Sequence, residues 1–141
     1  MGKRGARQEA IKRIVREHKV RTQRQLADLL VEAGHPCTQA TVSRDITMMG
    51  LQKTPDGYYV LQEDLHLARM MRELVTEVVA ASNLVVVKSL PGGAQGVGAA
   101  LDGAGLEGVI GSVAGDDTIL LVAADEEGAS DVVAQIDRYR R

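Results

Sequence analysis

Residues 38–46 read Thr-Gln-Ala-Thr-Val-Ser-Arg-Asp-Ile, and this stretch decides how the first half of the chain folds. Thr38 is a favoured helix N-cap, and Val42, Ile46 and Met49 follow at the spacing that buries one side of a helix. The opposite side carries short side chains and one arginine, namely Ala40, Thr41, Ser43, Arg44 and Thr47. On its own, the pattern would also fit an ordinary amphipathic surface helix.

The flanking sequence predicts further helices and a hairpin. Residues 22–25, Thr-Gln-Arg-Gln, fit a capping box, and an apolar stripe follows until Gly34 ends that helix. An earlier helix is expected over residues 7–18. Asp56-Gly57 is a strong turn signal between two short strand patterns, residues 51–53 and 58–61. Three helices and a hairpin indicate a winged helix-turn-helix, whose slim third helix could enter a DNA major groove.

Charge divides the chain into two unlike halves. Residues 1–62 hold 11 Lys and Arg against 6 Asp and Glu, a net of 11 − 6 = +5. Residues 63–141 hold 6 against 13, a net of 6 − 13 = −7, which together with +5 gives the total of −2. The basic half suits a polyanion such as double-stranded DNA, although a basic start could also be a merely solvated terminus.

Length and composition favour two small domains. We expect a DNA-binding domain over residues 1–62, a linker and the start of the next helix over 63–72, and a second domain over 73–141. Each half is small enough that a single core gives modest stability, and association through apolar surface would be an ordinary way to add to it. We find no membrane-spanning or signal pattern, and expect a cytoplasmic protein. Cys37 is the single cysteine and the histidines lack ligand spacing, so neither an internal disulfide nor a metal site is expected.

The second half alternates helical and strand patterns. Helices are predicted from Leu67 to Val78, over residues 94–101, and around Val132 to Ile136. Strands are predicted over residues 84–87, 108–113 and 118–124. Short apolar strands need helices over at least one face, so this half is predicted to be a compact α/β layer. The whole chain is therefore of the α+β or α/β class.

Two loops of this half are candidates for a binding site. Residues 91–95, Pro-Gly-Gly-Ala-Gln, lead from a strand into a helix whose N-terminus could hold a carboxylate, but taken alone they are better explained as a simple tight turn. Residues 114–118, Ala-Gly-Asp-Asp-Thr, place two adjacent carboxylates between apolar strands. A guanidinium would match such a pair, and an exposed acidic hairpin is the alternative. Asp102 adds a third carboxylate that folding could bring near.

These motifs together resemble the bacterial arginine repressor family. The resemblance rests on Thr-Gln-Ala-Thr-Val-Ser-Arg-Asp in the first half and on three motifs in the second. The latter are Pro-Gly-Gly-Ala-Gln, Leu101-Asp102 and residues 111–118, Gly-Ser-Val-Ala-Gly-Asp-Asp-Thr. The likeness spans nearly the whole chain, with the motifs in the right order and spacing.

The resemblance implies a transcriptional regulator of arginine metabolism that binds palindromic operators, with L-arginine as corepressor. It implies a C-terminal domain that trimerises, and a hexamer built as a dimer of trimers with arginine between subunits. Carried over by position, the operator contacts would be Gln39, Thr41, Ser43 and Arg44. The arginine pocket would be lined by Gln95, Asp102, Ser112, Ala114, Asp116 and Asp117.

Two other functions fit parts of the sequence. An architectural or recombination-accessory DNA-binding protein would share the fold but depend little on an effector. A small enzyme could use Asp116 or Asp117 as general acid or base. The sequence offers no plausible nucleophile, metal ligand set or cofactor cradle, and an enzyme would leave the basic helix-turn-helix unexplained. We therefore expect no catalytic residues and no cofactor besides L-arginine.

Overall fold

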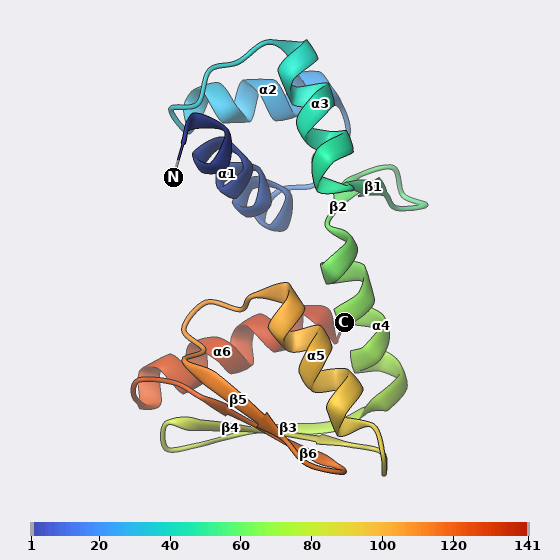
Figure 1. Cartoon of the computed structure of the whole chain (residues 1–141), viewed down its shortest axis with the longest axis vertical. Helices are drawn as coiled ribbons and strands as arrows, with labels where there is room; N and C mark the ends of the chain where they lie inside the picture. Colours follow the sequence, from blue (N-terminus) through green and yellow to red (C-terminus); the bar gives the residue numbers. More distant parts are fainter. Residues whose placement is uncertain (1, 141) are drawn as a thin grey trace. The chain divides into compact units, whose positions relative to one another are not determined.

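The computed structural model describes residues 2–140, and the chain divides after Gln62 into two compact units (Figure 1). The first unit contains three helices, α1 (Lys3–Glu17), α2 (Gln23–Glu32) and α3 (Gln39–Met49). A two-stranded antiparallel sheet follows, formed by β1 (Gln52–Lys53) and β2 (Tyr59–Val60). Helix α1 begins four residues before the predicted position. The order of elements is that of a winged helix-turn-helix, with β1, β2 and the turn between them as the wing.

Local capping explains the bounds of the second and third helices. Thr22 and Thr38 each accept a hydrogen bond from the backbone N–H three residues later, so each satisfies a free donor of its helix. Gly50 ends α3 with φ of 65°, in the left-handed region that favours glycine. The predicted apolar side of α3 faces the core, where Val42 is fully buried and Ile46 and Met49 are partly buried.

The second unit contains three helices and one sheet. The helices are α4 (Gln62–Leu74), α5 (Ala94–Ala104) and α6 (Glu126–Tyr139). The strands are β3 (Val75–Ala81), β4 (Leu84–Ser89), β5 (Gly111–Ala114) and β6 (Thr118–Val122), in the order β3-β4-β6-β5. All neighbouring strands are antiparallel. The predicted α+β arrangement is confirmed, and residues 63–72 are helical throughout.

Strand β3 is the element that sequence reasoning missed. Val78 continues the spacing of Leu67, Met71 and Leu74, which predicted one helix through all four positions. The structure ends the helix at Leu74 and begins β3 at Val75. Residues 75–81 are rich in valine, and this stretch pairs with β4 as an edge strand of the sheet, with a register shift between Val75 and Glu77. Tertiary pairing therefore overrides a helical period that four residues alone suggested.

The helices lie on one face of the sheet (Figure 1). Alternate residues of the central strands point to this covered face, and Val85, Val87, Ile119 and Leu121 are buried there at 0–1 % exposure. The other face carries an apolar row across all four strands. Val79 pairs with Val86, Val86 with Leu120, and Leu120 with Val113. Within this unit no helix covers that row, and Val113 remains 68 % exposed.

Candidate functional site

Helix α3 carries all four predicted DNA-contacting residues. Gln39 is the first residue of the helix and is exposed, as is Arg44. Thr41 and Ser43 are half-buried. Thr41 Oγ1 lies 3.0 Å from Thr38 Oγ1, within the N-cap itself. The four residues thus share one helix, and Gln39 and Arg44 are the two that are exposed.

A buried carboxylate fixes the other side of α3. Asp45 is 1 % exposed and accepts hydrogen bonds from Arg7 and Gln8 of α1. Burial raises the pKa of Asp45, but the hydrogen bonds from Arg7 and Gln8, together with the Arg7 charge, outweigh burial and hold it below the ordinary 3.8. The same pair raises the pKa of Arg7 above its ordinary value. Arg7 is thus one basic residue of the first half whose guanidinium is paired within the protein.

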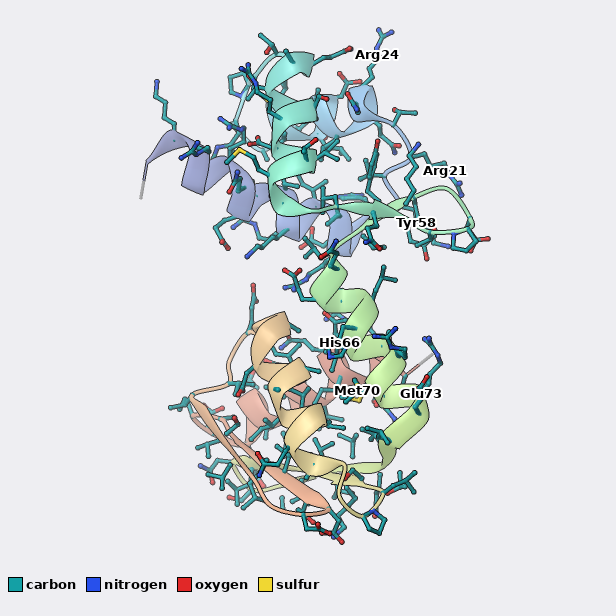
Figure 2. The ribbon with its side chains drawn as sticks, turned by 45° about the vertical axis from the view of Figure 1, so that its right-hand side comes forward. Arg21, Arg24, Tyr58, His66, Met70 and Glu73 are labelled. Carbon is teal, nitrogen blue, oxygen red and sulfur yellow. The ribbon has the colours of Figure 1, made fainter. Side chains whose placement is uncertain are left out.

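Basic residues also surround the wing. Lys19 Nζ lies 5.6 Å from the centre of the Tyr58 ring, and Lys53 Nζ lies 5.1 Å from that of Tyr59. Arg21 Nη1 donates to the carbonyl of Asp56 at the tip of the hairpin, at 2.6 Å. Figure 2 shows Arg21 beside the wing, to which Tyr58 itself belongs. These contacts give the wing a positive surface that the hairpin signal in the sequence did not reveal.

In the second unit, the predicted ligand residues gather where α5 lies along the edge strand β5. Gln95 Nε2 donates to the carbonyl of Ala114 at 2.8 Å. About two turns further along α5, Asp102 Oδ1 accepts a hydrogen bond from Ser112 Oγ of β5 at 2.9 Å. Gly98 permits this close approach, because a Cβ there would lie only 3.2 Å from the Cβ of Ala114. We call Gln95, Asp102, Ser112 and Ala114 the α5–β5 edge.

The acidic loop adjoins one end of this edge through backbone hydrogen bonds. The N–H of Ala94 donates to the carbonyl of Asp116 at 3.1 Å, and the N–H of Ser89 donates to that of Asp117 at 2.8 Å. Both backbone carbonyls are thereby used, while both side chains remain exposed. The loop that leads into α5 and the loop that carries Asp116 and Asp117 are therefore held together by backbone hydrogen bonds.

Lys88 is a neighbour of the acidic loop that the sequence did not single out. Its Nζ donates to Thr118 Oγ1 at 2.8 Å and lies 3.9 Å from Asp117 Oδ1. Thr118 Oγ1 in turn donates to Asp117 Oδ1 at 2.8 Å. Asp116 has no side-chain hydrogen bond or ion pair among residues 2–140. The two adjacent carboxylates therefore differ, since only that of Asp117 has a cation of its own chain beside it.

The arrangement is a surface half-site. Gln95, Asp102, Asp116 and Asp117 are exposed, and Ser112 and Ala114 are half-exposed. It offers carboxylates, an amide and a hydroxyl, which suit a cationic ligand with several N–H donors. Sites for small molecules usually enclose most of the ligand surface, which this exposed arrangement alone would not do. Among residues 2–140, no group of three or more His, Cys, Asp or Glu side chains is placed to hold a metal ion.

Comparison with known proteins covers both units. The family model described as "Arginine repressor, DNA binding domain" matches residues 2–67, and the one described as "Arginine repressor, C-terminal domain" matches residues 71–138. The chain belongs to the arginine repressor family. It is 41 % identical to the arginine repressor of Carboxydothermus hydrogenoformans, over 94 % of this chain and 96 % of the relative. It is 43 % identical to that of Symbiobacterium thermophilum, over 96 % and 97 %.

Membership of the arginine repressor family confirms the family resemblance found in the sequence. The arginine repressor of Desulfitobacterium hafniense is 46 % identical over 82 % of this chain and 85 % of the relative. The family consists of DNA-binding repressors, so the chain is a transcriptional regulator and not an enzyme. The architectural alternative finds no support among these relatives. Within residues 2–140, no helix is both long and apolar enough to cross a membrane.

Proposed function

We propose that this protein represses genes of arginine metabolism by binding palindromic operators, with L-arginine as its corepressor. The observation that carries the proposal is the meeting of the α5–β5 edge with the acidic loop, in a chain of the arginine repressor family. Free L-arginine carries a planar guanidinium and an α-ammonium, and both need acidic or carbonyl partners. Because its proposed target is chromosomal DNA, we propose that the protein acts in the cytoplasm.

Operator reading is proposed for the exposed side of α3. Arg44 would donate two hydrogen bonds to a guanine in the major groove, while Gln39, Thr41 and Ser43 would bond base edges or phosphates. The wing, with Lys19, Lys53 and Arg21 around it, would add phosphate contacts that carry no sequence information. This assignment gives sequence specificity to α3 and general DNA affinity to the wing, two elements of the same unit.

Arginine binding is proposed for Gln95, Asp102, Ser112, Ala114, Asp116 and Asp117. Asp116 is the strongest candidate for a cationic group of the ligand, because its carboxylate is exposed and lacks a cation within residues 2–140. Asp117 would share that role after competition with Lys88, which lies 3.9 Å away. The amide of Gln95 is held on Ala114, so it would orient the ligand along β5.

Self-association is proposed through the second unit, as a hexamer made of two trimers. The uncovered sheet face supports this, because Val79, Val86, Leu120 and Val113 form a continuous apolar row with two members more than 40 % exposed. Contiguous exposed apolar surface of this kind usually marks an interaction surface. A second copy would also supply the missing wall of the half-site, so that arginine bridges subunits and stabilises the assembly by mass action.

Coupling between the two ligands then follows from linkage. If arginine favours an assembly whose paired α3 helices match successive major grooves, operator DNA must tighten arginine binding by the same factor. The test is the affinity for an operator duplex at fixed salt, without ligand, with L-arginine, and with citrulline, whose ureido group is neutral. Tightening by arginine alone is expected. Equal affinity in all three conditions would refute the corepressor role.

A further inference from the structure

Among residues 2–140, the most deeply buried charged side chain is Asp45, which lies on the proposed reading helix and is not used by the proposed function. Asp45 is 1 % exposed, although its neighbour Arg44 is open to solvent. Burying a carboxylate without partners costs free energy, so other groups must pair with Asp45 to offset that cost. Among residues 2–140, Arg7 and Gln8 provide this compensation, and both belong to α1.

The contact between Arg7 and Asp45 restrains the relative orientation of the two side chains as well as their distance. The guanidinium of Arg7 uses Nε on Asp45 Oδ2 and Nη2 on Asp45 Oδ1, the latter at 3.0 Å. Gln8 Nε2 adds a third donor on Oδ1 at 3.2 Å. Two parallel bonds between planar groups permit little rotation of one against the other. With its side chain only 16 % exposed, Arg7 is committed to Asp45 and is not a free phosphate ligand.

The contact joins two helices that otherwise meet through a third. Helices α1 and α3 each pack mainly against α2, while the hydrogen bonds from Arg7 and Gln8 to Asp45 span 38 and 37 residues and reach α3 directly. Apolar packing on α2 tolerates small rotations and shifts, because side chains can repack. A bidentate ion pair tolerates them much less. The angle of α3 on the unit therefore depends on this pair.

We propose that Arg7 and Asp45 are positioning residues for operator recognition. By setting the rotation of α3, the pair aims Arg44 and Ser43 at base edges, where small misplacements forfeit hydrogen bonds that phosphate contacts would survive. The pair also neutralises a carboxylate on the helix that enters the groove, where an unpaired negative charge would repel the DNA backbone. The inference rests on the proposed reading role of α3.

The experiment compares specific with non-specific binding by the full-length protein in saturating L-arginine. Dissociation constants for an operator duplex and for a random duplex are measured at several salt concentrations, with urea unfolding in parallel. The variants are Arg7→Met, the double variant Arg7→Met with Asp45→Leu, and the control Lys12→Met. Lys12 is also a cation of α1 but pairs with Glu9, at 3.5 Å. The double variant guards against misfolding, because replacing both partners by apolar groups leaves no buried charge unpaired.

The expected result is a loss of specificity. In both Arg7 variants the ratio of operator to random-duplex affinity should fall about tenfold or more, the effect of a mismatched base pair. The slope of affinity against salt should stay unchanged, and Lys12→Met should keep the wild-type ratio. An unchanged ratio in the folded double variant would overturn the proposal and leave the pair a purely structural role.

Two further results have distinct meanings. If Arg7→Met weakens both duplexes equally and lowers the salt slope by about one unit, Arg7 is a phosphate contact and the proposal is overturned. Arg44→Ala is measured alongside to test the reading role itself. If that variant keeps the wild-type ratio, α3 does not read the operator, and the proposed function fails independently of Arg7 and Asp45.

Discussion

Lys88 and Asp117 form an ion pair inside the proposed arginine site, with 3.9 Å between Nζ and Oδ1. The register of the sheet brings the two residues together, because Lys88 of β4 lies opposite Thr118 of β6, which follows Asp117 in the chain. Thr118 links the two groups, accepting from Lys88 and donating to Asp117. The site therefore contains a cation of its own, which relieves repulsion between the adjacent carboxylates when no ligand is bound.

Replacing Lys88 by methionine should tighten arginine binding. The ligand would no longer compete with the ammonium group for Asp117. Both side chains are exposed, at 40 % and 52 %, so the pair contributes only about 0.2–1 kcal/mol and the gain should not exceed about fivefold. Calorimetric titration with L-arginine measures it, with Arg138→Met as a control for lost charge. Weaker binding in Lys88→Met would instead show that Lys88 holds Asp117 in the binding geometry.

Replacing Asp116 by asparagine should weaken arginine binding more than the same change at Asp117. The Asp116 carboxylate has no partner in residues 2–140, whereas that of Asp117 is shared with Lys88 and Thr118. Loss of a charge-assisted hydrogen bond costs about 1.5–3 kcal/mol, which is about tenfold to a hundredfold in affinity. Operator binding by Asp116→Asn should lose its arginine dependence and keep its basal level. Asp131→Asn, on the exposed side of α6, is the matched control, and equal weakening by all three would contradict the assignment.

The sequence predicted those features whose signals are local. The N-caps at Thr22 and Thr38 and the hairpin turn at Gly57 each depend on a few adjacent residues. The meeting of residues 91–95 with residues 114–118 was expected from the family resemblance, and the structure joins them through Ala94 and Asp116. Periodicity failed at Val78, where strand pairing decided the outcome.

The sequence could not predict the contacts that depend on tertiary structure. Nothing near Lys88 shows that the strand register will bring it to Thr118, thirty residues away. Likewise, Asp45 reads as part of a polar helix face until α1 is docked beside it. In the sequence alone, Arg7 is likewise only one of several basic residues near the N-terminus. Such pairs arise from packing between elements far apart in the chain, which no local pattern encodes.

Replacing Arg44 by alanine should reduce operator affinity and leave assembly unchanged. Loss of a bidentate contact to a base costs about 1–3 kcal/mol and relaxes specificity at that base pair. Arginine binding should be unaffected, because Arg44 belongs to the other unit. Fluorescence anisotropy with operator and random duplexes measures the effect, and light scattering measures the assembly. Loss of the oligomer in Arg44→Ala would refute this division of roles.

The stability of the first unit should fall in acid because of Asp45. Its pKa in the folded protein lies below the ordinary 3.8, so the ionised form stabilises the fold. This contribution is complete above the unfolded pKa and is lost as pH falls through the folded value. Urea unfolding between about pH 5 and pH 2 should therefore show a decline that is shallower in Asp45→Asn. The same pH dependence in both proteins would show that other carboxylates cause it.

Replacing Leu120 by lysine should break the proposed assembly without unfolding the second unit. Leu120 is paired with Val86 and Val113 on the uncovered face, and it is 37 % exposed. The core on the other face, including Ile119 and Leu121, does not depend on it. A charge within a buried apolar interface is strongly unfavourable, and the arginine half-site would lose its second wall.

Sedimentation velocity should show dissociation, and calorimetry should show lost arginine binding, while circular dichroism stays unchanged. Val31→Lys, at a residue of α2 that is 55 % exposed, should remain assembled. An intact, arginine-responsive oligomer of Leu120→Lys would place the subunit interface elsewhere on the molecule.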